Sequence, residues 1–188
     1  MKKLVILFLL CLTTSAHAFE LAGAKLDDKV QVAEKQELLL NGAGIRTRLF
    51  FRIYVAGLYL GEKKQTAEAV LADSGAKRIA LHVVIGEVAP DHFLDGFRKG
   101  IEKNHTAQEV SALRERMQAF DKMFEPVKSV KKGDEIDFDW LPGTGTRISM
   151  NSAELGRING EDFYHALLKI WLGDKPVDGD LKKGLLGG

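Results

Sequence analysis

The single cysteine of the chain sets the first limit on its fold. Cys11 lies in an N-terminal segment in which two lysines precede an apolar run, residues 4–12, and the small-residue sequence Ala16-His17-Ala18 follows. This order is typical of a secretory signal peptide, with cleavage predicted after Ala18. The remaining 170 residues contain no cysteine. An exported chain without cysteine forms no disulfide and no thiolate metal site, so an apolar core alone must stabilise it.

We therefore predict a signal peptide over residues 1–18 and a single domain over residues 19–188. A chain of that length fits one domain of ordinary size, and it contains no internal repeat or linker. The apolar run of the leader is shorter than the roughly 20 residues that cross a bilayer, and we predict no transmembrane segment in the mature chain. The predicted location is the bacterial periplasm.

The composition excludes several classes of protein. With 45% hydrophobic and 28% charged residues, the chain has the make-up of a globular protein rather than a disordered or fibrous one. Loss of Lys2 and Lys3 with the leader changes the formal net charge from +1 to −1. Binding of nucleic acid requires a strongly basic face, so we predict no nucleic-acid partner. The oligomeric state is left open.

Hydrophobic periodicity predicts strands first and helices mostly later. Strands are expected over residues 30–40, with a break near Glu34-Lys35, over 45–60 and 77–85, and in a hairpin over 135–150. Helices are expected over 66–73, from Pro90, from the capping box Thr106-x-x-Glu109, and over 159–172. This order predicts an α+β fold, a large antiparallel β-sheet with a layer of helices on one face.

Motifs for metal or cofactor binding are weak. Glu135, Asp137 and Asp139 alternate with apolar residues, a period that indicates a solvated strand face rather than a calcium loop. The histidines of the mature chain lack the spacing of a transition-metal site, and no nucleotide-binding or hydrolase motif is present. We predict no metal and no cofactor.

One stretch is unusual for a strand, Asn41-Gly42-Ala43-Gly44-Ile45-Arg46. Glycines inside a strand suggest a bulge, or a backbone that another group approaches closely. A guanidinium at this place is suited to bind a carboxylate through a bidentate pair. Spacing alone leaves a second interpretation open, in which Arg46 is an ordinary surface arginine.

The same stretch, followed by Gly57-Leu58-Tyr59-Leu60, resembles the N-terminal signature of the chalcone isomerase-like superfamily. Three later segments agree with that family in the same order: Phe120-x-x-x-Phe124-x-Pro126-Val127, the hairpin with its Pro142-Gly143 turn, and residues 158–186. The chain looks closest to the exported bacterial branch. The resemblance implies an open sandwich of sheet and helices that encloses an apolar cleft.

The resemblance also implies which catalytic groups are present. Chalcone isomerases use an arginine supported by a threonine, a tyrosine, an asparagine and a late hydroxyl residue. Only the arginine matches, at Arg46; the threonine position holds Tyr54, the late hydroxyl position holds Ile170, and residues 91–103 contain neither tyrosine nor asparagine. Loss of one preorganised donor costs about 10²–10³ in rate. Efficient chalcone isomerase activity is not expected, and no catalytic residue is assigned.

An arginine with a tyrosine instead resembles the noncatalytic fatty-acid-binding branch, in which this pair holds the ligand carboxylate. This resemblance implies a small amphipathic carboxylate as ligand, held by Arg46 and Tyr54. We place Phe50, Phe93 and Trp171 in the apolar wall of the cleft. The pair is eight residues apart, about 26 Å along one strand at roughly 3.3 Å per residue. The two residues must therefore lie on adjacent strands joined near residues 49–51.

Two alternatives to ligand binding remain. One is an isomerase or intramolecular lyase with an unknown substrate. The other is a structural protein that binds a protein partner and keeps a vestigial cleft.

Overall fold

A seven-stranded antiparallel sheet forms the centre of the computed structural model, which describes residues 18–34 and 36–188. The predicted signal peptide lies outside the described residues, except for Ala18, where the first strand begins. In spatial order the strands are β11 (Ala153–Ile158), β10 (Gly145–Met150), β9 (Glu135–Leu141), β6 (Lys77–Val83), β5 (Phe51–Leu60), β4 (Gln36–Arg48) and β3 (Lys29–Ala33). Two small antiparallel pairs accompany it, β1 (Ala18–Leu21) with β2 (Ala24–Asp27), and β7 (Glu87–Val88) with β8 (Val130–Lys131).

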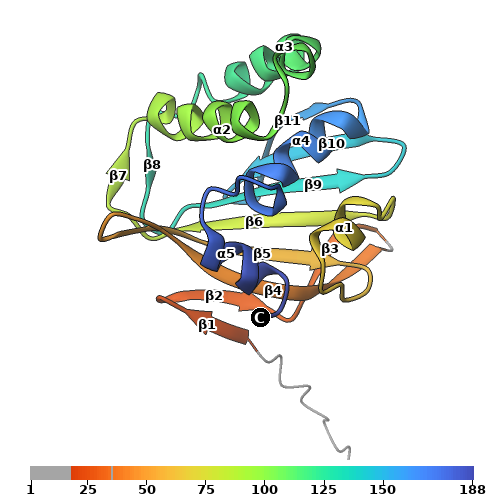
Figure 1. The fold of residues 1–188 in the computed structure, drawn as a ribbon. Helices are drawn as coiled ribbons and strands as arrows, with labels where there is room; N and C mark the ends of the chain where they lie inside the picture. The colour runs from red at the N-terminus through yellow and green to blue at the C-terminus, as the bar shows by residue number, and fades with distance from the viewer. Residues whose placement is uncertain (1–17, 35) are drawn as a thin grey trace, which may run out of the picture.

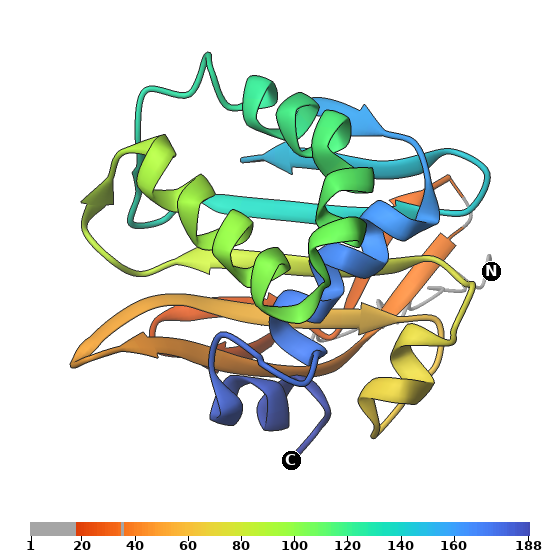
Figure 2. The ribbon, with the colours of Figure 1, turned by 45° about the horizontal axis from the view of Figure 1, so that its top comes forward.

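Helices form a layer on one face of this sheet (Figure 2). They are α1 (Ala67–Leu71), α2 (Pro90–Asn104), α3 (Ala107–Met123), α4 (Glu161–Leu172) and α5 (Gly179–Leu185). Pro90 begins α2, and the reciprocal Thr106–Glu109 capping box begins α3, as the sequence predicts. The predicted α+β architecture is confirmed. Strands β1, β2, β7, β8 and β11 were not predicted; they have two to six residues, too few for a periodic pattern to identify a strand.

The sheet is buried on its other face as well, which the sequence did not predict. Along β5, Tyr54, Ala56 and Leu58 pack into the core beneath the helices. Val55 packs against β2, and Tyr59 against β3 and the start of β4. The sheet curls so far that Arg147 of β10 donates a hydrogen bond to the carbonyl of Val32 in β3, at 2.8 Å. The N-terminal strands thus cover the face opposite the helices (Figures 1 and 2).

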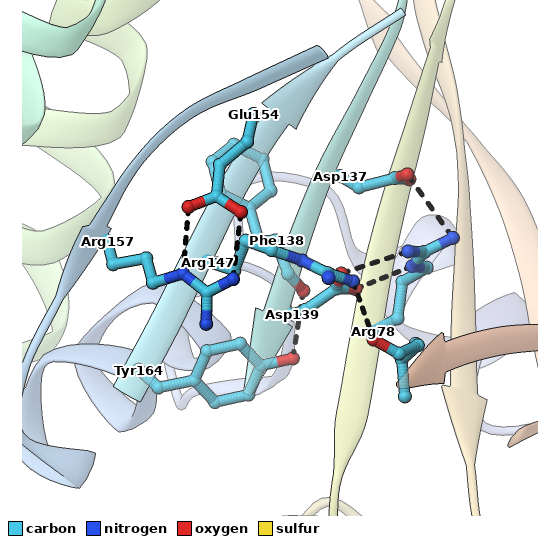
Figure 3. Close-up of polar contacts among 9 residues, drawn as sticks. Arg78, Asp137, Phe138, Asp139, Arg147, Glu154, Arg157 and Tyr164 are labelled. Atoms are coloured by element: carbon cyan, nitrogen blue, oxygen red, sulfur yellow. Dashed lines mark hydrogen bonds and ion pairs between the residues drawn. The ribbon is translucent and has the colours of Figure 1, made fainter. Parts of the chain in front are cut away.

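The acidic residues of β9 lie on this covered face, so the prediction of a solvated face is wrong for Asp137 and Asp139. Both side chains are buried. Figure 3 shows Asp139 between two guanidinium groups: Arg78 donates through Nη2 at 2.9 Å and Arg147 through Nε at 3.0 Å. Arg78 also pairs with Asp137 at 3.2 Å. A buried carboxylate persists in such a place because its partners supply hydrogen bonds and opposite charge.

Substitution Asp139→Ala should lower the free energy of unfolding by about 3–5 kcal/mol, because it leaves two largely buried guanidinium groups without their carboxylate. Glu154→Ala is the control, since Glu154 pairs with Arg157 in solvent and such pairs contribute at most about 1 kcal/mol. Urea denaturation measures both. Equal losses for the two variants would contradict a dominant role for the buried pair.

Helix α5 packs directly on β4. A Cβ atom at Gly42 would overlap the carbonyl oxygen of Gly184, and one at Gly44 would lie 2.9 Å from a methyl carbon of Leu181. The side-chain amide of Asn41 donates to the carbonyl of Leu185 at 2.7 Å. The predicted close approach to Gly42 and Gly44 is confirmed, and the group that approaches is the last helix.

Candidate functional site

A cavity of about 380 Å³ lies between the β4–β5 hairpin and helices α2 and α4. Its wall is mainly apolar, with charged and polar groups contributed by β4, β5 and the start of α2. The lining residues are Arg46, Arg48, Ile53, Tyr54, Ile85, Val88, His92, Phe93, Asp95, Gly96, Phe97, Ile170 and Trp171. Its size falls in the range of small-molecule sites, about 300–1,000 Å³.

The β4–β5 hairpin brings Arg46 and Tyr54 together. They are directly paired across the two strands, and a two-residue turn at Leu49 and Phe50 joins the strands. The guanidinium carbon of Arg46 lies 5.8 Å from the centroid of the Tyr54 ring. The predicted arrangement on adjacent strands is thus present, without the Gly or Asn usual in such turns.

Tyr54 is fixed by a hydrogen bond from the opposite wall. The indole N–H of Trp171 on α4 donates to the Tyr54 hydroxyl oxygen at 2.9 Å, and both side chains are buried. Burial raises the pKa of Tyr54, and the nearby Arg46 charge only partly opposes this. The hydroxyl therefore stays protonated at neutral pH. Because its oxygen accepts from Trp171, its own proton is oriented for donation to another acceptor.

Arg46 is half-buried at the edge of the cavity. No ion pair joins it to a carboxylate anywhere in residues 18–34 and 36–188. Its acidic neighbour, Asp178, accepts the backbone N–H of Thr47 at 3.0 Å and caps α5. Burial raises the pKa of Asp178, but these N–H groups and the Arg46 charge outweigh burial and hold it below its usual value. Arg46 thus keeps donors for a bound anion.

Four of the five predicted ligand contacts line this cavity: Arg46, Tyr54, Phe93 and Trp171. The placement of Phe50 in the wall is wrong. Phe50 lies in the hairpin turn, beyond the ends of both strands, where neither a strand nor a helix covers it, and its side chain is 96% exposed.

Several wall residues were missed. Phe97 follows Phe93 by one helical turn, and this spacing would have found it. Ile170 lies on the apolar stripe of the predicted helix over 159–172 and marks the position of a missing hydroxyl, but it was not assigned to the wall. Ile85 ends the predicted strand over 77–85, on its apolar face, but was not assigned to the wall. Val88 lies in β7, in a connection whose course depends on tertiary packing, so no local pattern points to it.

The arrangement is suited to an amphipathic anion. The Arg46 cation and the oriented Tyr54 hydroxyl lie beside an aromatic and aliphatic wall. The charged head of such a ligand would contact the two polar groups, and its apolar chain would contact the wall. Three other ionisable side chains lie in the wall: Arg48 on β4 and His92 on α2 are exposed, and Asp95 on α2 pairs with Lys99 at 2.7 Å. In the part of the chain that the structure describes, no cluster of three His, Cys, Asp or Glu side chains is placed to hold a metal ion. None of the described helices has the length and hydropathy needed to cross a bilayer.

Comparison with known proteins agrees with this architecture. The model of the chalcone isomerase-like family matches residues 18–187, and the chain belongs to that family. Among solved structures, a fatty-acid binding protein of Arabidopsis thaliana is similar, with a TM-score of 0.68 at 15% identity over 90% of this chain and 96% of that chain. No curated protein matches the sequence. At this identity the likeness concerns the fold.

Substitution Tyr54→Phe should lower the free energy of unfolding by about 1–3 kcal/mol, because the buried indole N–H of Trp171 loses its acceptor. A double-mutant cycle with Trp171→Phe isolates this bond from the lost packing. We expect a coupling energy of about 1 kcal/mol in urea denaturation. Additive losses, within about 0.3 kcal/mol, would show that the bond does not stabilise the fold.

Proposed function

We propose that this protein binds a fatty-acid-like carboxylate in the cavity beneath α2 and α4. The carboxylate is held by the guanidinium of Arg46 and the hydroxyl of Tyr54, and the chain lies against Phe93, Phe97 and Trp171. The observation that carries the proposal is the Arg46–Tyr54 pair at an apolar cavity: a cation without an ion pair among the described residues, beside a hydroxyl whose oxygen already accepts from Trp171.

The energetics favour an anionic head with an apolar tail. Charge-assisted hydrogen bonds are about twice as strong as neutral ones, and Arg46 and Tyr54 offer two kinds of donor to one carboxylate. Each methylene group removed from water adds about 0.8 kcal/mol. The fold shared with a plant fatty-acid binding protein supports this choice of ligand.

We further propose that binding is not accompanied by efficient chalcone isomerisation. At the position of the family's threonine the cavity has Tyr54, and at that of its late hydroxyl it has Ile170. Helix α2 lines the cavity with the buried Phe93 and Phe97 and with the more exposed His92 and Asp95, and its residues 91–103 supply neither the tyrosine nor the asparagine of the family's catalytic set. The signal-peptide pattern of residues 1–18 supports a periplasmic location, so the ligand would be one present in that compartment.

A matched pair of ligands tests the proposal. The wild-type protein should bind a fatty acid more tightly than the fatty alcohol of the same chain length, since only the acid carries the charge that Arg46 recognises. Arg46→Gln should weaken binding of the acid about 10- to 100-fold, the equivalent of about 1.5–3 kcal/mol, and leave binding of the alcohol unchanged. Fluorescence of Trp171 in the cavity wall provides the titration signal.

Arg114→Gln is the control, because Arg114 is an exposed arginine on α3 and its substitution causes the same change of charge. It should bind both ligands as the wild type does. Carboxylate recognition by Arg46 would be refuted if the wild type bound acid and alcohol with equal affinity, or if Arg46→Gln lost the same amount of affinity for each ligand. Failure of both ligands to bind the delipidated wild type would refute the proposed function.

A further inference from the structure

The turn of the β4–β5 hairpin displays three consecutive large apolar side chains in solvent. Leu49, Phe50 and Phe51 are 82%, 96% and 64% exposed. Among the described residues, the other large apolar side chain of this kind is Phe19, 46% exposed on β1. Figure 2 shows the hairpin reaching the edge of the molecule. Apolar groups gathered at a projecting tip are unfavourable in water and indicate a surface that contacts something apolar.

The backbone of this turn is costly in its own right. Leu49 has φ +57°, the left-handed region that two-residue hairpin turns normally reach with Asn, Asp or Gly. A glycine at this place would remove the steric cost and the exposed side chain together. The chain instead has leucine there, so the display of apolar side chains is not a by-product of turn formation.

Positive charge surrounds the tip. Arg48 and Arg52 flank the three apolar residues in sequence, and both are exposed. Neither forms an ion pair within the part of the chain that the structure describes. An apolar tip with cations at its base matches the layering of an anionic bilayer, in which acyl chains lie beneath negatively charged headgroups. A purely apolar protein partner would leave these cations unmatched.

The same hairpin forms one wall of the cavity. Arg46, Arg48 and Ile53 line it, and each lies within four residues of the turn. A membrane that holds the tip is therefore close to the cavity and to the guanidinium that would receive a carboxylate.

We propose that residues 48–52 insert into the surface of an anionic lipid bilayer and place the cavity for direct exchange of its ligand with that bilayer; the exchange, but not the insertion, rests on the proposed function. Leu49, Phe50 and Phe51 enter the upper acyl region, and Arg48 and Arg52 contact lipid phosphates. These side chains are already exposed in the folded protein, so insertion requires no unfolding.

Sedimentation with vesicles tests the insertion. The wild-type protein should bind vesicles of phosphatidylcholine with about 30% phosphatidylglycerol, and bind pure phosphatidylcholine vesicles much more weakly. Phe50→Ser should reduce the partition constant on anionic vesicles at least tenfold. Arg52→Gln should reduce it severalfold and weaken its dependence on salt. Both positions are exposed and outside the cavity, so melting temperature and fatty-acid binding in solution should stay unchanged.

A tryptophan at the tip measures depth. Fluorescence of Phe50→Trp should shift to the blue on anionic vesicles and be quenched by brominated lipids. Phe19→Trp is the matched control, because Phe19 is also an exposed aromatic residue and lies beside Leu39 and Leu40, at the other end of β4. It should show neither change.

The outcomes separate the two proposals. If vesicle binding depends on Phe50 but the protein binds no fatty acid in solution, the proposal of insertion stands, and both the ligand exchange and the proposed function are refuted. Fatty-acid binding without vesicle binding overturns the insertion alone. The insertion is also refuted if the protein does not bind vesicles and forms a dimer that Phe50→Ser dissociates, because the tip then contacts a second copy of the chain. If insertion and fatty-acid binding are both observed, Phe50→Ser should slow the transfer of a fatty acid from anionic vesicles to the protein and leave the affinity for the fatty acid in solution unchanged.

Discussion

The pairing of β4 with β5 decides where the functional groups of this protein lie. Its register sets Arg46 opposite Tyr54, eight residues later in the chain, and places both at one end of the sheet. A shift by one residue would turn each side chain to the opposite face. Tyr54 could then no longer accept from Trp171, which lies on the helical side. The cation, the oriented hydroxyl and the exposed turn therefore all follow from this one hairpin.

Burial on both faces fixes that register. Because the curled sheet has the helices on one side and the N-terminal strands on the other, Tyr54 and Val55 each have a packed environment of their own. On the covered face, the buried carboxylate of Asp139 has to remain paired with the guanidinium groups of Arg78 and Arg147 (Figure 3). Apolar burial on both faces thus fixes the alignment of β4 with β5, and the buried ion pairs fix the alignment of β6, β9 and β10, the strands on which Arg78, Asp139 and Arg147 lie.

Local patterns predicted most of the fold because its helices begin and end with strong signals. The capping box at Thr106 and Gly173 mark helix boundaries through backbone hydrogen bonds, and Pro90 marks one through the fixed φ of its ring; neighbouring residues alone determine each of these signals. The covered face could not be predicted in this way. Asp137 and Asp139 alternate like solvent-facing residues, and only the curl of distant strands encloses them.

The candidate site was predictable to the extent that it resembles a family motif. Arg46 and Tyr54 were found from that resemblance, and Phe93 from its place on a helical stripe. Phe50 was misplaced because an aromatic side chain in a β-rich run was expected to face the apolar cleft; it lies instead in the two-residue turn that joins the strands, where Leu49 takes a position that glycine or asparagine usually holds. Leucine at position 49 thus removes the usual sequence mark of a turn and also adds an apolar side chain to the exposed tip.

The contact of α5 with β4 has a consequence for the history of the sequence. Gly42, Gly44 and Gly184 meet with almost no side chain between two backbones, so bulk added on one side has to be compensated by a shift on the other. None of the three residues can become smaller, so no change at one of them makes room for a side chain at another; all three should therefore remain glycine among homologues, although residues 44 and 184 are 140 positions apart in the chain.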